Sequence, residues 1–189
     1  MKYYSEHSKE YIENTKDVDM STIYEFFEKY LNANSKRIMD LGFGSGRDSL
    51  YFKNKGYEVC SIDPTPEFCD YGKKIGLDYV RCIKAEELDF NNEFDGIWAC
   101  SSLLHIASKN LNDVFKRCYK ALKKDGVMYA SFKYGTFDGQ RDGRYFLDLD
   151  EETFKGFVNN TGFEIIDILI TYDLRPGRDV KWLNVIIKK

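Results

Sequence analysis

A short apolar segment that runs directly into alternating glycines constrains the fold of this chain more than any other feature. Residues 38–41 are apolar apart from Asp40, and glycine then stands at every second position, at Gly42, Gly44 and Gly46. Glycine permits positive φ and lets a ligand lie against bare backbone at the start of a helix. The pattern therefore predicts a buried strand, a ligand-binding turn and a helix directly after it.

Segments of strand and helix character alternate along the chain. We expect strands at residues 37–41, 57–62, 79–83, 94–100, 127–132, 163–171 and 180–187, and helices at residues 5–15, 21–31, 47–55, 67–75, 111–122 and 151–159. Parallel strands need crossover connections, and the helices of those connections cover both faces of the sheet. The link 172–179 has no helix pattern, so the last two strands should form an antiparallel hairpin at the sheet edge. The sequence predicts an α/β fold with a doubly wound, mostly parallel, seven-stranded sheet and two N-terminal helices as a lid.

An acidic residue follows the second expected strand. Asp63 stands 21 positions after Gly42, near the distance at which an acid meets a ribose hydroxyl in a dinucleotide site. A nicotinamide or flavin dinucleotide prefers G-x-G-x-x-G, whereas this loop has G-x-G-x-G. The combination predicts a ligand that contains a nucleoside, and an NAD-dependent oxidoreductase is one alternative.

The segment 40–48 resembles the first motif of class I S-adenosylmethionine-dependent methyltransferases, and order and spacing agree from about residue 35 to about residue 135. Asp63 matches that family's ribose-binding acid, residues 85–90 lie where its adenine-contacting loop falls, and residues 94–105 resemble its fourth-strand motif. Many relatives have aspartate where this chain has Lys84, which shifts the expected adenine contact to Glu86 or Glu87. The run 98–105 looks most like the bacterial small-molecule branch that includes the tellurite-resistance methyltransferases.

This resemblance implies a Rossmann-like sheet, S-adenosylmethionine as the cofactor and no metal. It implies that the three glycines line the methionine moiety, that Asp63 binds both ribose hydroxyls, and that Cys100 passes close to the sulfonium. The expected cofactor-binding residues are Tyr11, Thr15, Asp40, Gly42, Gly44, Gly46, Arg47, Asp63, Pro64, Ala85, Glu86, Glu87, Cys100 and Ser101.

Methyl transfer from a sulfonium is an in-line displacement that mainly needs alignment in a dry pocket. An acceptor that carries a proton benefits from a base, and His105, just beyond the fourth strand, is the best placed candidate. The alternative is that His105 caps a short helix or binds backbone. Arg144 and Tyr134, from the long polar segment 133–146, complete the expected catalytic set.

Four arginines fall in the two segments expected at this end of the sheet. They could converge on the pocket mouth and bind an anionic acceptor, or form ion pairs with neighbouring aspartates. The arginines are Arg141, Arg144, Arg175 and Arg178, and the aspartates are Asp138, Asp142, Asp173 and Asp179.

Charge and cysteine usage narrow the possible partners. The formal net charge is −3 and the sequence pI is about 5.5, which argues against a nucleic-acid substrate. Five cysteines without a C-x-x-C pair, and the lack of a secretion signal or apolar membrane-spanning run, lead us to expect a cytoplasmic protein. We expect a monomer or homodimer with one domain over residues 1–189, divided into a helical lid (1–34), a cofactor-binding half (35–135) and an acceptor side (136–189).

A small-molecule methyltransferase is the main hypothesis about function. Methylation of a protein side chain is an alternative that predicts an open groove, and a non-catalytic module that binds S-adenosylmethionine is another.

Overall fold

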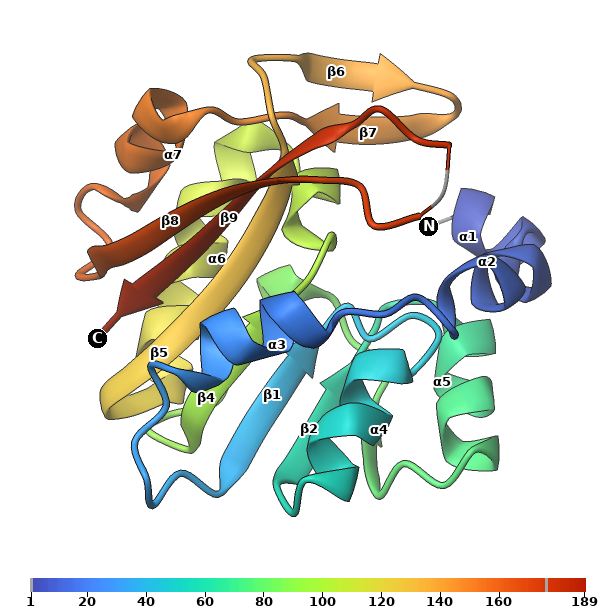
Figure 1. Ribbon diagram of the computed structural model, residues 1–189, viewed down its shortest axis with the longest axis horizontal. Helices are drawn as coiled ribbons and strands as arrows, with labels where there is room; N and C mark the ends of the chain where they lie inside the picture. Colours follow the sequence, from blue (N-terminus) through green and yellow to red (C-terminus); the bar gives the residue numbers. More distant parts are fainter. Residues whose placement is uncertain (1, 176) are drawn as a thin grey trace.

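A seven-stranded sheet forms the centre of the structure, a computed structural model that describes residues 2–175 and 177–189. Its strands lie in the order β3-β2-β1-β4-β5-β9-β8 (Figure 1). They are β1 (Arg37–Leu41), β2 (Glu58–Ile62), β3 (Tyr79–Arg81), β4 (Phe94–Ala99), β5 (Leu122–Lys133), β8 (Glu164–Tyr172) and β9 (Lys181–Lys188). The strands from β3 to β5 are parallel, and β9 runs antiparallel to both β5 and β8. The mostly parallel sheet with an antiparallel edge hairpin is therefore confirmed.

Helices cover both faces of the sheet because its strands are apolar on both sides. One face carries α3 (Ser21–Glu28), α4 (Arg47–Asn54) and α5 (Pro66–Lys74), and the other carries α6 (Ser108–Ala121) and α7 (Glu151–Val158) (Figure 1). Alternate residues of each strand supply the two cores: Ile38 and Trp98 pack beneath α3, whereas Met39 and Ile97 pack on the side of α6.

The N-terminal region contains three helices where the sequence predicts two. A short α1 (Lys2–Glu6) precedes α2 (Ser8–Thr15), with a break at His7, and both lie over the carboxyl ends of the strands (Figure 1). The expected helix 21–31 ends at Glu28, and it packs Ile23 and Phe27 on the sheet. Only α1 and α2 are thus placed as a lid over the strand ends.

The segment 133–146, expected as a long loop, contains most of a second small sheet. Strands β6 (Asp138–Arg141) and β7 (Arg144–Leu147) form an antiparallel hairpin above the main sheet (Figure 1). Its two turn residues, Asp142 and Gly143, have φ of 52° and 73°. Asp-Gly at a two-residue turn is a recognised hairpin signal, because both positions need positive φ.

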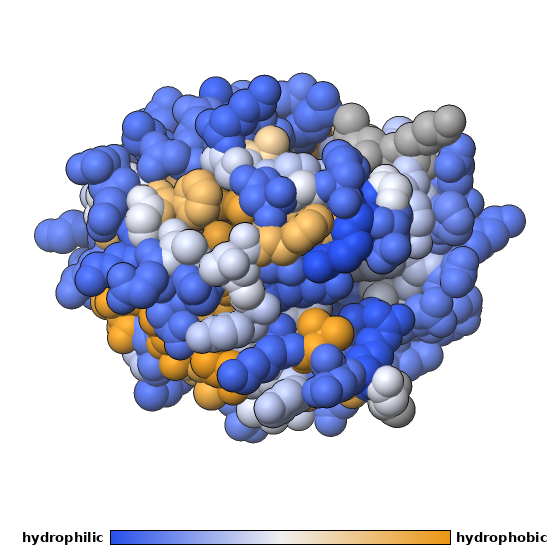
Figure 2. Space-filling view, turned by 90° about the horizontal axis from the view of Figure 1, so that it is seen from above, coloured by the Kyte–Doolittle hydropathy of each residue, from blue (hydrophilic) through white to orange (hydrophobic). Residues whose placement is uncertain are grey.

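The strand order reverses between β1 and β4. In open α/β sheets, ligands bind outside the carboxyl ends of the strands at such a reversal. Two 3-10 turns, η1 (Ala85–Glu87) and η2 (Leu103–His105), lie at this end as well. Seen from this end, the surface is mainly hydrophilic, with hydrophobic residues in separate patches (Figure 2). Within residues 2–175 and 177–189, no helix is long and apolar enough to cross a membrane.

Candidate active site

Two adjoining cavities occupy the carboxyl end of the sheet. The first, which we call the glycine cavity, measures about 340 Å³ and is lined by the glycine loop, the end of β2, η1 and the residues after β4. The second, the arginine cavity, measures about 170 Å³ and is lined by residues from α2, β5, β7 and the β8–β9 connection. Five residues line both cavities: Tyr4, Tyr11, Gly42, Ser101 and His105.

The glycine loop is packed too closely for side chains. Gly42 has φ +84°, and a Cβ built there would lie 2.3 Å from the Cβ of Ser102. Gly44 has φ +50°, and its Cβ would lie 2.9 Å from the Tyr11 ring. Both glycines line the glycine cavity, whereas Gly46 lines neither cavity and instead provides the left-handed N-cap of α4. Backbone alone therefore forms the wall of the cavity at this loop.

Asp63 places a buried carboxylate beside this loop. Its Oδ2 accepts a hydrogen bond from the backbone N–H of Gly44 at 3.2 Å, and its Oδ1 accepts one from Thr65 at 2.8 Å. Burial raises the pKa of Asp63, although these hydrogen bonds oppose the increase. Asp63 and Pro64 both line the glycine cavity. A carboxylate in this position can accept hydrogen bonds from the two hydroxyls of a ribose.

The rest of the glycine cavity also fits a nucleoside. Ser102 has a buried hydroxyl with no hydrogen-bond partner among the described residues, as expected for a group that meets a ligand. The side chains of Phe68, Ile83 and Ile106 supply apolar surface for a base. Ala85 and Glu86, both in the expected cofactor-binding set, line the cavity.

Glu87 is a correction to the expected cofactor set. Its carboxylate turns back and accepts a hydrogen bond from the backbone N–H of Lys84 at 2.9 Å. This contact caps η1, so Glu87 does not line the glycine cavity. The adjacent Glu86 is the acid that faces it.

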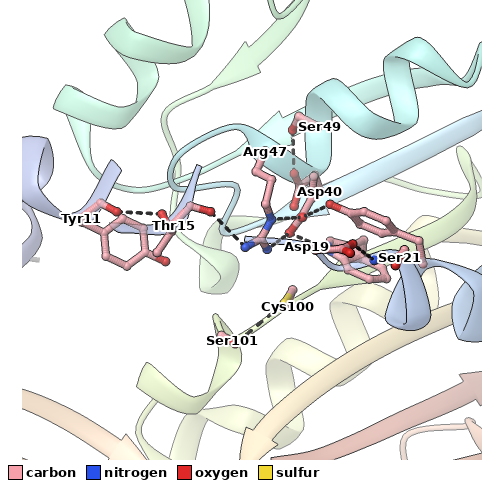
Figure 3. A network of polar contacts seen from close by, with 12 residues as sticks. Tyr11, Thr15, Asp19, Ser21, Asp40, Arg47, Ser49, Cys100 and Ser101 are labelled. Carbon is pink, nitrogen blue, oxygen red and sulfur yellow. Dashed lines mark hydrogen bonds and ion pairs between the residues drawn. The ribbon is translucent and has the colours of Figure 1, made fainter. Parts of the chain in front are cut away.

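Asp40 is a second correction, because it lies behind the loop and lines neither cavity. The Ser49 hydroxyl donates to its Oδ2 at 2.6 Å, which ties β1 to α4 (Figure 3). Burial raises the pKa of Asp40 well above its usual range, and the nearby charge of Asp48 adds to the increase. The residue supports the loop from beneath.

Arg47 links the lid to the sheet. Its guanidinium donates to both oxygens of Asp48, at 2.7 and 2.9 Å, and to the backbone carbonyl of Thr15 at 3.2 Å (Figure 3). Burial alone would raise the pKa of Asp48, but the charge of Arg47 and hydrogen bonds from Arg47, Tyr24 and Trp98 hold it below its ordinary value. Arg47 and Thr15 line the arginine cavity.

Cys100 and Ser101 lie where β4 ends. Cys100 lines the arginine cavity, and burial raises the pKa of its thiol to about 11, so the thiol is neutral at physiological pH. Ser101 adopts a positive φ of 52°, and its backbone N–H donates to the Ser131 hydroxyl at 2.8 Å. The chain thus turns sharply between the two cavities.

His105 is hydrogen-bonded through both ring nitrogens. Its Nδ1 lies 2.8 Å from the backbone carbonyl of Tyr145, so Nδ1 carries the proton. Its Nε2 therefore accepts the hydrogen bond from the Tyr4 hydroxyl, at 2.6 Å. The pKa of His105 is lowered to about 4, mainly by burial and also by the charges of Arg144 and Lys133, while the hydrogen bond to the Tyr145 carbonyl opposes the decrease. The ring is therefore neutral at physiological pH.

Arg144 completes this group. Its Nη1 donates to the Tyr4 hydroxyl at 3.4 Å, and its guanidinium lies over the rings of Tyr3 and Phe146, at 4.3 and 5.0 Å from the centroids. Burial raises the pKa of Tyr4, and Arg144 opposes the increase. Tyr4, on α1, therefore joins the lid to η2 and β7.

The arginines of these two segments were expected either to converge on the pocket mouth or to form ion pairs with neighbouring aspartates, and both arrangements occur. Arg175 pairs with Asp173 at 2.5 Å, as the ion-pair alternative predicts. Arg141 pairs with Asp148 at 3.0 Å, which is none of the expected partners, and it lines neither cavity. Arg144 and Arg178 line the arginine cavity together with Arg175.

Tyr134 is a third correction. Its hydroxyl donates to Glu151 at 2.8 Å, and the residue lines neither cavity. The neighbouring Lys133 lines the arginine cavity instead. Sequence reasoning did not single out Lys133 or Ser102, although both follow directly on the carboxyl ends of expected strands.

No group of three or more His, Cys, Asp and Glu side chains in the described part of the chain is arranged to hold a metal ion.

Part of the chain is similar to known methyltransferases. Residues 39–130 match the family model described as a methyltransferase domain. The chain is 30% identical over 166 residues to a phosphoethanolamine N-methyltransferase of Plasmodium falciparum, covering 84% of this chain and 57% of the relative. It is 24% identical over 166 residues to an uncharacterized methyltransferase of Staphylococcus carnosus, covering 80% and 78%. The chain thus spans little more than half the length of the first of these relatives.

A solved structure confirms the fold. The Burkholderia thailandensis 1,6-didemethyltoxoflavin-N1-methyltransferase, determined with 1,6-didemethyltoxoflavin and S-adenosylhomocysteine, superimposes with a TM-score of 0.81. That likeness covers 99% of this chain and 84% of the other at 21% identity. At this identity the likeness establishes the shared Rossmann-like fold alone.

Proposed function

We propose that this chain, which carries a methyltransferase domain at residues 39–130, transfers the methyl group of S-adenosylmethionine to a small-molecule acceptor. The observation that carries the proposal is the junction of the two cavities. The glycine cavity, which contains a buried acid, adjoins the arginine cavity, and the two share the lining residues Tyr4, Ser101 and His105. Donor and acceptor bound in these cavities would meet at those walls.

The cofactor supplies a methyl group on a positively charged sulfur, and the chain supplies alignment and a water-poor environment. Asp63 binds the ribose hydroxyls, and the bare backbone at Gly42 and Gly44 admits the methionine moiety. The Ser102 hydroxyl gains the partner that it lacks in the described part of the chain. Glu86 is the acid that faces the adenine.

Aromatic rings from the lid close the junction. Tyr4 and Tyr11 line both cavities and lie edge to face, with ring centroids 5.4 Å apart. Aromatic faces attract cations, so these rings favour a sulfonium in the space beside them. Thr15 and Arg47 hold α2 in place, since Arg47 bonds the backbone of Thr15.

His105 acts through Tyr4 in this proposal. Because Nδ1 donates to backbone and Nε2 accepts from the Tyr4 hydroxyl, His105 offers no nitrogen directly to an acceptor. A proton that leaves the acceptor passes to the Tyr4 oxygen while the Tyr4 proton passes to His105 Nε2. Arg144, which donates to the same oxygen, stabilises negative charge there during the transfer.

A small-molecule acceptor fits the arginine cavity, which measures about 170 Å³. Two relatives have names that refer to small molecules: the Plasmodium protein acts on phosphoethanolamine, and a Nitrobacter winogradskyi protein, 32% identical over 101 residues, is a ubiquinone biosynthesis O-methyltransferase. That second match covers 50% of this chain and 38% of the relative. The resemblance of residues 98–105 further suggests the bacterial small-molecule branch that includes the tellurite-resistance enzymes.

The proposed division of labour follows the chain. Within residues 1–34, α1 and α2 supply the lid; residues 35–135 supply the cofactor side, and residues 136–189 supply part of the acceptor side. All five cysteines are free thiols, which fits a reducing compartment and supports a cytoplasmic location.

The test is a transfer assay with S-adenosylmethionine that carries a deuterated methyl group. The protein is incubated with a panel of small amines, alcohols, thiols and oxyanions, and S-adenosylhomocysteine and labelled product are measured by mass spectrometry. We expect equal amounts of both from at least one acceptor, and none with Asp63→Ala. Label transferred only to added proteins would replace the small-molecule proposal with a protein acceptor.

A further inference from the structure

The arginine cavity holds more positive charge than its own acids neutralise. Its lining includes five basic side chains, Arg47, Lys133, Arg144, Arg175 and Arg178, and two acids, Asp48 and Asp173. Asp48 pairs with Arg47, and Asp173 pairs with Arg175. Within the described residues, Lys133, Arg144 and Arg178 form no ion pair with a carboxylate, so three of the five basic side chains lack an ion-pair partner.

Arg144 has an unsatisfied donor at this place. Its Nε–H is buried and finds no hydrogen-bond partner among the described residues. A buried N–H on a charged group costs free energy when it is left without an acceptor. The remaining contacts of the side chain are with the Tyr4 hydroxyl and with aromatic rings, none of which carries a negative charge. The Nε–H of the guanidinium therefore lacks a hydrogen-bond acceptor.

Lys133 lies beside the same aromatic ring. Its Nζ is 4.4 Å from the centroid of Phe146, and the Arg144 guanidinium is 5.0 Å from it. Burial lowers the pKa of Lys133, the charges of Arg141 and Arg144 add to the decrease, and the charge of Asp148 opposes it. Arg141, also at this ring, is neutralised by Asp148. Two uncompensated cations are thus held together by one ring, and an anion between them would relieve their repulsion.

We propose that the acceptor carries an anionic oxygen group, a carboxylate or a phosphoryl group, which is bound jointly by Arg144 and Lys133 beside Phe146. Arg144 presents Nε–H to the anion as a directed donor, and Lys133 supplies a point charge. The anion sits on the β7 side of the junction, so the rest of the acceptor extends toward Tyr4 and His105. This inference rests on the proposed function, because it assigns the substrate class of the same site.

The test uses the complex with S-adenosylhomocysteine and two probes, inorganic phosphate and acetate, titrated by calorimetry at constant ionic strength set with chloride. We expect saturable binding of at least one probe with one site per chain. Affinity should fall at least about tenfold in Arg144→Gln and in Lys133→Gln. The matched control is Lys116→Gln, which removes the same charge from the exposed side of α6 and should leave affinity unchanged.

The same samples separate failure of this inference from failure of the proposed function. Binding of S-adenosylhomocysteine by each variant shows that it is folded and tests the cofactor site independently. If phosphate binds more tightly than acetate, we assign a phosphoryl group to the acceptor. If acetate binds more tightly, we assign a carboxylate. If S-adenosylhomocysteine binds but neither anion binds, or if Arg144→Gln and Lys133→Gln bind both probes like the wild type, the anionic acceptor is refuted while the methyltransferase proposal stands.

Discussion

The glycine cavity and the arginine cavity meet at the same strand ends but are built in different ways. The first combines the bare backbone of two glycines at positive φ with side chains from the segments that end β2 and β4, among them a carboxylate held by backbone N–H groups. The second is lined by parts of the glycine loop, α4 and the end of β4, together with side chains from α1 and α2, β5, β7 and the β8–β9 connection. The cavity proposed for the cofactor thus depends strongly on one local turn of the backbone. The cavity proposed for the acceptor depends on side chains that are far apart in the sequence.

A substitution in the shared wall should separate the two cavities most clearly. Tyr4→Phe removes the hydroxyl that donates to His105 but keeps the ring. We expect kcat to fall about 100-fold, because the proton path is lost, while S-adenosylhomocysteine affinity stays within about threefold. Tyr3→Phe is the control, since Tyr3 contributes its ring to Arg144. Equal kcat in Tyr4→Phe and wild type would show that His105 takes no part in proton transfer through Tyr4.

A pair of glycine variants tests whether the glycine cavity requires bare backbone at Gly42. Gly42→Ala places a Cβ 2.3 Å from Ser102, whereas Gly56→Ala has no atom within 4 Å of its Cβ, and both positions have positive φ. Both should lose about 1–3 kcal/mol of unfolding free energy from backbone strain. Gly42→Ala should also lose S-adenosylhomocysteine affinity by at least about tenfold. Calorimetry that finds the two variants binding alike would show that close packing at Gly42 does not shape the cofactor site.

The neutral state of His105, in the wall that the two cavities share, predicts a pH dependence of the free energy of unfolding. Its pKa is about 4 in the folded chain and about 6.5 when unfolded, so between these values the unfolded chain binds a proton that the folded chain does not. The free energy of unfolding should therefore be unaffected by this group above about pH 6.5 and should fall as the pH drops toward 4. One group contributes at most about 1.4 kcal/mol per pH unit.

Denaturant unfolding at several pH values measures this slope in the protein without ligand. His105→Gln should flatten the curve between pH 6.5 and 4, and His7→Gln, which changes an exposed residue, should not. A slope that persists in His105→Gln would assign the acid sensitivity to other groups.

The smallest effect is expected outside both cavities. Tyr134→Phe removes only a hydrogen bond to Glu151, so kcat, KM and S-adenosylhomocysteine affinity should stay within about twofold of wild type. Steady-state kinetics check this. A loss of activity comparable to that of Tyr4→Phe would show that the segment around Tyr134, between β5 and β6, changes position when the methyl acceptor binds.

Much of the fold could be predicted because its signals are local. The segment 38–46 contains a strand, a turn and a helix start within nine positions, and Asp63 follows at the end of the next strand. The β6–β7 hairpin was missed even though Asp142-Gly143 is a local hairpin signal, because the surrounding polar residues resemble a loop. At this hairpin the residue types of the turn indicate the structure, whereas the hydropathy pattern does not.

The acceptor side was harder to predict because it depends on contacts between distant residues. Tyr4 and His105 are 101 positions apart, and no periodicity brings them together. Asp40 and Glu87 have the residue type and position of ligand contacts, yet local hydrogen bonds to Ser49 and Lys84 turn them away. Tyr134 and Lys133 are neighbours along the chain at the end of β5, yet only Lys133 lines the arginine cavity, and the sequence does not show which of two adjacent side chains points into it.

The central claim is that the glycine cavity binds S-adenosylmethionine, and a calorimetric titration tests it most directly. Wild-type protein and the isosteric variant Asp63→Asn are titrated with S-adenosylhomocysteine and, separately, with NAD. We predict micromolar binding of S-adenosylhomocysteine by wild type, a loss of at least about tenfold in Asp63→Asn, and no binding of NAD. Binding of NAD with no binding of S-adenosylhomocysteine would contradict the claim.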